Sequence, residues 1–359
     1  MKYLGKLHEM TERFPQTNVW NDSCALEELQ YALDRGAVGA TTNPVIILQV
    51  LEKEADIWHA PLMEIIKTES SACEDDIACM LIEQIVRERS RLLLPIFKNS
   101  GGKVGRLSVQ TNPKIFRNAE RMIEEAVRLN SIAPNIQVKI PGNEEGLRAI
   151  EESTFLGVNV NATAVFTISQ MLAVAEAIER GLRRREQRGL TTKDMSPVCT
   201  LMIGRVDDWI KEYAKRRGIL ANPEYMEWAG VAIFKKAYRI FCQRKYRTRI
   251  LTAGMRNYYH WSALIGADCS MTISYEWQKR INESAIDIVC NYEKPVESRF
   301  LSELMKLDAF VRSYSQDGYT PNEFSEIPMF KITLLSFLSG YDELVRKIRQ
   351  MMFYGESGA

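Results

Sequence analysis

The strongest constraint on the fold is a recurring pattern of short apolar runs that each lead into a polar residue. About eight such runs occur in the 359-residue chain, at 19–20, 37–40, 106–109, 135–140, 157–160, 198–203, 250–254 and 269–273. Segments with the periodicity of an amphipathic helix lie between them, as at 115–127. Strands that alternate with helices indicate βαβ units, and eight of them predict a closed (β/α)8 TIM barrel.

Helical segments beyond those of a minimal barrel are predicted at about 57–97, at about 205–246 and after residue 289. The last helix, at about 328–352, has an apolar face that includes Phe337 and Leu344. We expect one barrel domain over residues 1–359, in which residues from about 290 to 359 form a C-terminal helical extension packed against the barrel. The apolar face of the last helix could cover the site or form a homodimer contact, and the sequence does not choose between them.

The composition excludes several classes of protein. Hydrophobic residues make up 46%, charged residues 26%, and the net charge of +1 gives no field that would attract nucleic acid. The basic cluster at 180–188 is interpreted as a solvated helix end. Seven cysteines without a C-x-x-C pair and three histidines without zinc-ligand spacing predict no metal site. We expect no signal peptide, no membrane span or membrane partner, and a cytoplasmic location.

Lys139 lies alone among apolar residues in a run that reads as a short buried strand. An ammonium group costs several kcal/mol to bury without a partner, so this lysine is either paired or has a lowered pKa. A salt bridge with Glu144 or with an acid of another strand would be the structural interpretation. A lysine with a lowered pKa is a nucleophile that forms a Schiff base with a carbonyl compound, and this is the functional interpretation.

Charged residues also follow the predicted strands, at the barrel end where active sites form. Asp22 is positioned to exchange a proton with a sugar hydroxyl, although it could instead cap the helix that begins near Ala25. Arg205 and Arg256 suit bidentate binding of a phosphate, whereas an ion pair with the nearby Asp207 or Asp208 is the structural alternative for Arg205. Neutral side chains at the same ends suit the hydroxyl groups of a polyhydroxylated ligand: Asn43, Gln110, Asn112, Asn161, Thr163 and Ser274.

Taken in order, these segments resemble the transaldolase family. The similar segments are Thr-Thr-Asn-Pro at 41–44, Val-Lys-Ile-Pro at 138–141, Val-Asn-Ala-Thr at 160–163, Gly-Arg-Val-Asp-Asp-Trp at 204–209, Arg-Asn at 256–257 and Gly-Ala-Asp at 266–268. With the Asp22 strand ahead of them, they cover about residues 19–274. The resemblance implies a (β/α)8 barrel that carries out class I aldol chemistry without a metal or an organic cofactor.

The resemblance also implies a role for each matching residue. Lys139 matches the Schiff-base lysine, Asp22 the acid/base aspartate, and Thr163 a residue that supports the catalytic water. The matching substrate-binding residues are Asn43 and Asn161 for the dihydroxyacetone part and Arg205 and Arg256 for the phosphate; Thr41 and Ser274 are added as further candidates.

Departures from the family pattern concern proton transfer and substrate binding. Gln110 falls where transaldolases typically carry a glutamate that works through the catalytic water, and glutamine cannot transfer protons. Fructose-6-phosphate aldolases also have glutamine there, but they pair it with a tyrosine where this chain has Met202 and transaldolases have phenylalanine. Gly254 and Thr200 replace two serines.

Three functions are therefore compatible with the sequence. The first is transfer of a three-carbon dihydroxyacetone unit between sugar phosphates through a Schiff base on Lys139. The second is cleavage that releases dihydroxyacetone, as in fructose-6-phosphate aldolases. The third is a barrel that binds a sugar phosphate without turning it over, which the altered residue Gln110 would favour.

Overall fold

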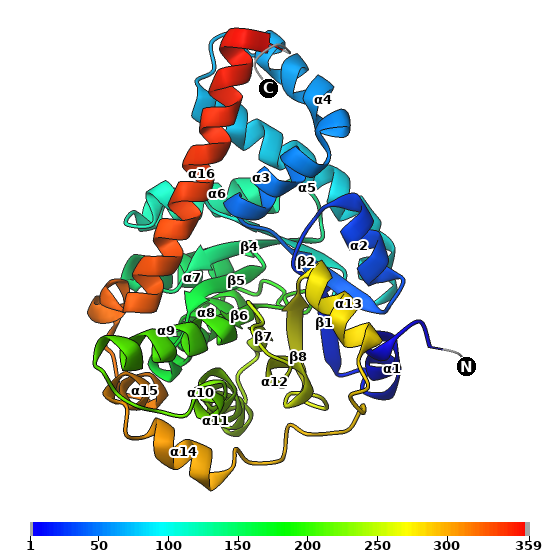
Figure 1. Ribbon diagram of the computed structural model, residues 1–359. Helices are drawn as coiled ribbons and strands as arrows, with labels where there is room; N and C mark the ends of the chain where they lie inside the picture. Colours follow the sequence, from blue (N-terminus) through cyan, green and yellow to red (C-terminus); the bar gives the residue numbers. More distant parts are fainter. Residues whose placement is uncertain (1–2, 356–359) are drawn as a thin grey trace.

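Eight parallel strands form a closed barrel in the computed structural model, which describes residues 3–355. Each strand pairs with its neighbours in chain order, and β1 also pairs with β8 to close the barrel (Figure 1). The strands are β1 (Thr17–Asn21), β2 (Ala37–Thr41), β3 (Arg106–Gln110), β4 (Ile136–Pro141), β5 (Val160–Val165), β6 (Val198–Leu201), β7 (Arg249–Thr252) and β8 (Cys269–Ile273). The prediction of a (β/α)8 barrel is confirmed.

Helices surround the barrel because each connection between parallel strands must return to the starting edge. This outer layer includes α2 (Leu26–Leu33), α6 (Ala119–Asn130), α7 (Glu144–Leu156), α8 (Ile168–Gln187), α11 (Ala229–Arg244) and α13 (Tyr275–Glu283). The helix α1 (Lys6–Arg13) precedes β1 and packs against α13. Shorter helical turns are η1 (Pro113–Ile115), α10 (Pro223–Met226) and α12 (Tyr259–Ser262).

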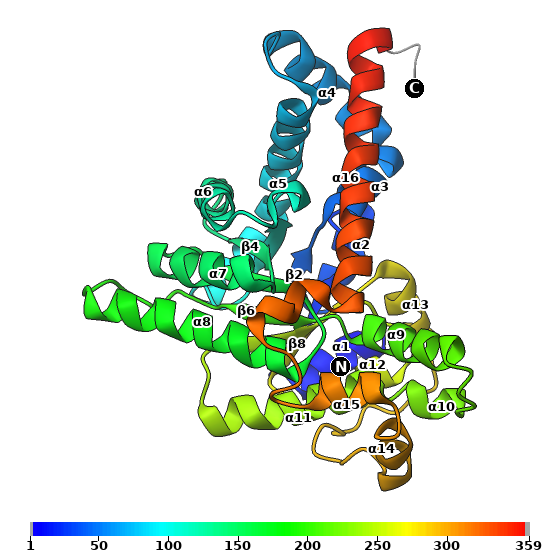
Figure 2. The same ribbon diagram turned by 90° about the vertical axis from the view of Figure 1, so that its left-hand side faces the viewer.

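The predicted additional helices are present. Between β2 and β3 lie α3 (Pro44–Lys53), α4 (Ala55–Thr68) and α5 (Glu74–Asn99), and β6 is followed by α9 (Ile203–Arg216). After β8 come α14 (Ser298–Leu304), α15 (Asp308–Tyr314), η2 (Pro321–Glu326) and the long helix α16 (Pro328–Tyr354). Figures 1 and 2 show α16 crossing the barrel end and then rising beside α3 and α5, against which it packs. Among residues 3–355, no helix is long and apolar enough to cross a membrane.

One predicted strand is displaced, and this matters for the site. The run at 157–160 was expected to end before Asn161, but β5 begins at Val160 and continues to Val165. Gly157 is the reason: it caps α7 with a left-handed backbone (φ 93°), so the apolar residue after it belongs to the connection between α7 and β5. Asn161 consequently lies within β5 rather than beyond its carboxyl end.

The apolar part of the barrel interior is a small cluster that consists of Trp20, Val198, Leu251 and Ala253. Gly39 of β2 makes room for the indole, because a Cβ atom there would lie 2.5 Å from ring atoms of Trp20. The much larger apolar core lies outside the barrel, between strands and helices. This layer of four side chains therefore separates the two ends of the barrel.

Candidate active site

A cavity of about 180 Å³ opens at the carboxyl ends of the strands. Its walls come from seven strands or the loops that follow them, from α9 and from α16. Its lining consists of Asp22, Thr41, Asn43, Lys139, Thr163, Thr200, Met202, Arg205, Ala253, Gly254, Arg256, Thr272 and Phe337. Seven of the eleven candidate residues named from the sequence are in this set.

Lys139 projects into this cavity from β4 and is only 6% exposed. Burial lowers the pKa of Lys139 to about 8, against the opposing effect of the charge on Asp22. Its Nζ donates a hydrogen bond of 2.9 Å to the carbonyl oxygen of Thr42. Within the part of the chain that the structure describes, Lys139 forms no ion pair, so the salt bridge with Glu144 is not formed.

A lowered pKa alone does not mark Lys139 as reactive. Burial also lowers the pKa of Lys235 to about 8. The ammonium of Lys235, however, donates to the carbonyl oxygens of Asn291, Tyr292 and Lys294, which hold all its protons in structural bonds. Lys235 also borders a cavity, so the difference lies in the hydrogen bonds: Lys139 donates only one, which leaves two of its protons uncommitted beside Asp22 and the arginines.

Asp22 directly follows β1 and is held by two neighbouring strands. Its backbone N–H donates to the carbonyl of Ile273, and its Oδ1 accepts a 2.7 Å hydrogen bond from the Thr41 hydroxyl. That hydroxyl also lies 2.7 Å from the Thr272 hydroxyl. Burial raises the pKa of Asp22, while the bond from Thr41 and the charges of Lys139 and Arg256 oppose this shift. Asp22 does not cap α2, because the N-cap position is Ala25.

The two arginines reach the cavity from α9 and from the loop after β7. Arg205 lies in the first turn of α9, and no hydrogen bond or ion pair of its side chain occurs among residues 3–355. Burial lowers the pKa of Arg205, and the positive charge of Arg256 adds to this effect. The predicted alternative of an ion pair between Arg205 and an aspartate is wrong, since Asp208 binds Arg256 Nε at 2.9 Å instead.

The second aspartate, Asp207, is fully buried and orients the loop that carries Arg256. Its Oδ2 lies 2.8 Å from Nε2 of His260, and its Oδ1 accepts a bond from the backbone N–H of Gly230. The other ring nitrogen of His260, Nδ1, accepts a 3.1 Å bond from the backbone N–H of Arg256. This arrangement fixes the imidazole with its proton on Nε2 and holds the Arg256 backbone in place.

Four predicted residues do not line the cavity. Asn112 is the N-cap residue of η1, where its Oδ1 accepts a bond from the backbone N–H of Lys114. The amide of Asn161 accepts a 2.6 Å bond from the Thr200 hydroxyl and donates to Ser108 Oγ at 3.1 Å, so Asn161 lies behind Thr200. Ser274 stands beyond the end of β8, as the N-cap residue of α13, and Thr272 is the residue of that strand that reaches the cavity.

Gln110, the fourth, lines a separate small cavity of about 10 Å³, as does Asn112. Thr163 and Phe337 contribute to the walls of both cavities, so the small one is directly adjacent to the larger one. The Oε1 atom of Gln110 is buried and has no hydrogen-bond partner among the described residues. A bulge in β5 next to Ala164, whose φ is 53°, accompanies this placement of Thr163.

Several known proteins are similar in sequence to this chain. Residues 19–325 match the family described as transaldolase/fructose-6-phosphate aldolase. The chain is 32% identical over 210 residues to a transaldolase of Thiobacillus denitrificans, which covers 58% of both chains. It is 31% identical over 206 residues to transaldolase 2 of Streptomyces coelicolor, covering 57% of this chain and 55% of the relative. A Mycobacterium tuberculosis transaldolase is 29% identical over 232 residues, or 62% and 61% of the two chains. The chain thus spans less than two thirds of the length of these relatives.

Proposed function

This chain belongs to the transaldolase/fructose-6-phosphate aldolase family, and on that basis we propose that it transfers a three-carbon dihydroxyacetone unit between sugar phosphates. The observation that carries the proposal is the joint placement of Lys139 and Asp22 in one cavity. A buried amine with a pKa near 8 is a nucleophile, and a carboxylate held by Thr41 is a proton acceptor.

The reaction begins when the neutral amine of Lys139 attacks the C2 carbonyl of a ketose phosphate and expels water to give an imine. Asp22 then accepts the proton of the C4 hydroxyl. The C3–C4 bond breaks, its electron pair moves toward the imine to form an enamine, and an aldose phosphate leaves. The enamine adds to the aldehyde carbon of an acceptor, and hydrolysis of the new imine frees Lys139.

The small cavity beside Gln110 supports a role for a water molecule in these steps. Its volume of about 10 Å³ is at the lower limit for one water. The Oε1 atom of Gln110, which lacks a partner among residues 3–355, would accept a hydrogen bond from that water. Thr163 lies between the two cavities and would connect this water to the substrate. Because an amide cannot take up a proton, we assign Gln110 to orientation of the water.

The phosphate would bind between Arg205 and Arg256 at the N-terminus of α9. Arg205 has no protein partner within residues 3–355 and is half-buried, so it can offer its guanidinium to a dianion. The positive end of the helix dipole adds to this attraction. Asn43 would bind a hydroxyl of the dihydroxyacetone part, while Thr41 orients Asp22 and Asn161 orients Thr200. Ser274 lies at the rim and would contact only a larger substrate.

A second function is favoured by one specific residue. Gln110 has the identity found in the aldolase branch of the family, in which the enamine is protonated and dihydroxyacetone is released. A product assay with and without an acceptor aldehyde separates the two functions, since only transfer requires the acceptor. Release at the same rate without acceptor would establish cleavage.

The decisive test is borohydride trapping with fructose 6-phosphate, followed by mass analysis of the intact protein and its peptides. A three-carbon adduct on Lys139 is expected, because it requires both imine formation and C3–C4 cleavage. Lys139→Ala should keep the fold and lose all adduct and turnover. Lys235→Ala is the matched control, since Lys235 shares the lowered pKa but lies outside the cavity. Substantial activity in Lys139→Ala would refute the mechanism.

A further inference from the structure

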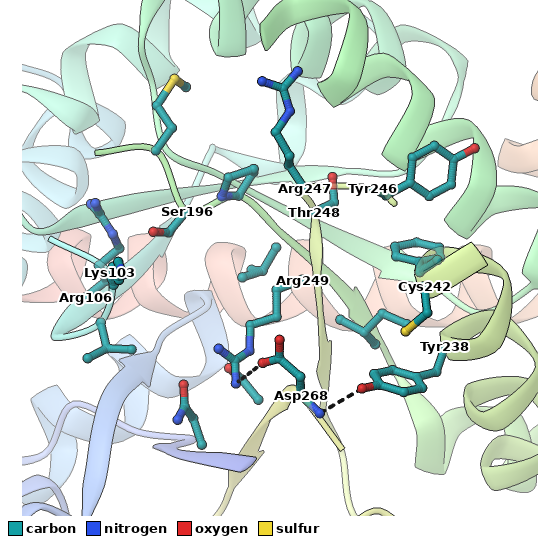
Figure 3. Close-up of a pocket in the computed structure, with 18 of the residues that line it drawn as sticks. Lys103, Arg106, Ser196, Tyr238, Cys242, Tyr246, Arg247, Thr248, Arg249 and Asp268 are labelled. Atoms are coloured by element: carbon teal, nitrogen blue, oxygen red, sulfur yellow. Dashed lines mark hydrogen bonds and ion pairs between the residues drawn. The ribbon is translucent and has the colours of Figure 1, made fainter. Parts of the chain in front are cut away.

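A second cavity, of about 350 Å³, lies at the opposite end of the barrel (Figure 3). It is formed by residues of β1, β3, β6, β7 and β8 toward their amino ends, by the segments that precede these strands, and by the C-terminal half of α11. It shares no lining residue with the candidate active site. The mechanism above makes no use of this cavity.

The lining is strongly cationic and only partly neutralised. Five cationic residues line the cavity, namely Lys103, Arg106, Lys245, Arg247 and Arg249, against one carboxylate, that of Asp268. Arg247 is paired with Glu179 and Glu186, and Arg249 with Asp268 at 3.0 Å. Three positive charges remain, because within residues 3–355 Lys103, Arg106 and Lys245 have no carboxylate partner.

Arg106 is the most unusual of these cations, since it is only 1% exposed. Its Nη2 donates to the backbone carbonyls of Gly102 and Asp194, at 2.8 and 2.9 Å, rather than to an acid. Burial lowers the pKa of Arg106 to about 10. A buried guanidinium without a counter-ion is costly, and an anion in the adjacent cavity would offset that cost.

Unpartnered buried polar atoms provide an independent observation. The Nε1 of Trp20, the Nε atoms of Arg106 and Arg249, and the hydroxyl of Thr248 have no hydrogen-bond partner among the described residues, and all four side chains line the cavity. Trp20 and Thr248 are each only 3% exposed. Asn18 also lines the cavity, and its Oδ1 lacks a partner among the described residues, but the three unused N–H groups and one hydroxyl outnumber this single acceptor. Because buried donors are normally satisfied, they indicate a ligand rich in acceptor oxygens.

The walls also differ in character from one side to the other. Figure 3 shows Lys103 and Arg106 on one side, Tyr238 and Tyr246 on the other, and Arg249 between them. We propose that this cavity is a binding site for a phosphorylated small metabolite, with the phosphate near Arg106 and Arg249 and the organic part against the two tyrosines. Nucleotides and sugar phosphates share this chemistry, and the experiment distinguishes them.

The test is calorimetric titration of the full chain with three probes: inorganic phosphate, ribose 5-phosphate and adenosine 5′-monophosphate. Because the candidate active site also attracts phosphate, each titration is repeated with Arg205→Gln, which weakens only that site. The proposal predicts binding that survives Arg205→Gln and is weakened at least about tenfold by Lys103→Gln combined with Lys245→Gln. The stronger organic probe identifies the ligand class, and both should bind more tightly than inorganic phosphate.

Two controls separate loss of binding from loss of fold. Lys98→Gln combined with Lys215→Gln removes the same charge from exposed lysines outside the cavity and should leave binding unchanged. Lys245→Gly removes one cavity charge at a residue with a left-handed backbone (φ 54°), where glycine is favoured, so weaker binding with an unchanged or higher Tm excludes unfolding. Equal weakening in the control pair, no binding in Arg205→Gln, or inorganic phosphate binding as tightly as both esters would overturn the proposal. These outcomes are independent of imine formation on Lys139.

Discussion

Replacing Asp22 by asparagine should separate imine formation from carbon–carbon bond cleavage. Asparagine has the same shape, and its Oδ1 can still accept the hydrogen bond that Thr41 now donates to Asp22. The substitution removes the carboxylate that accepts the C4 proton. It also removes the negative charge that opposes the lowering of the Lys139 pKa. We therefore expect Asp22→Asn to form the first imine readily but to cleave it slowly.

The change in imine formation can be worked out from the pKa of about 8 for Lys139. At pH 7 about 9% of such an amine is neutral, roughly 300-fold more than for an ordinary lysine. Loss of a nearby opposite charge lowers a lysine pKa by about one unit or more, so about half of the amine should be neutral at pH 7 in the variant. Loss of general acid–base catalysis lowers turnover by about 10²–10⁴-fold.

Borohydride trapping over pH 6–9 measures both quantities. With fructose 6-phosphate, the variant should accumulate an uncleaved six-carbon adduct on Lys139, and the pH midpoint of trapping should move below that of the wild type. Asp56→Asn, an exposed change on α4, is the matched control and should behave as the wild type. A three-carbon adduct formed by Asp22→Asn at the wild-type rate would refute the assigned role.

Four further predictions concern stability and substrate use. Lys139→Met should raise the free energy of unfolding at pH 7 by about 3 kcal/mol, because the wild type has to charge a buried group whose pKa falls from 10.5 to about 8. In the wild type, stability should correspondingly rise with pH between about 8 and 10.5, as urea titrations would show. Arg89→Met should lower the free energy of unfolding by about 3–5 kcal/mol in the same assay, because the substitution leaves Glu54 buried without its partner. Gln110→Glu should raise the rate of transfer to an acceptor aldehyde, and an unchanged rate would remove this residue from the mechanism. Arg205→Lys should raise KM for a phosphorylated donor about tenfold or more, with little change for the unphosphorylated sugar.

Local patterns were sufficient for most of the barrel because each strand carries its own signal of apolar residues ended by a polar one. They failed at β5, where Val158 continues an apolar run although the preceding Gly157 belongs to a helix cap. A shift of three residues moved Asn161 from the strand end into the barrel interior. The error in one strand boundary thus changed the interpretation of a candidate site residue from substrate contact to support of Thr200.

The remaining features depend on contacts between distant segments. Phe337 lines the cavity because α16 crosses the barrel end, and no pattern around residue 337 relates it to Lys139. Asp208 is three residues from Arg205 on α9, which predicts a pair, yet it binds Arg256 from the loop after β7. The short separation in sequence therefore predicts the wrong ion pair, because a competing arginine comes from the loop after another strand.

The cavity at the amino end of the barrel has no signal of its own in the sequence. Side chains two residues apart in a strand share a face, so Trp20 and Asp22 of the first strand segment line opposite cavities, as do Ser270 and Thr272. The polar residues expected at the carboxyl ends of the strands lie on the side of Asp22 and Thr272, and not on the side of Trp20 and Ser270. The cations before β3 and β7 are visible in the sequence as separate short clusters. Only closure of the barrel brings them around one space, and for that reason their combined charge becomes apparent only in the fold.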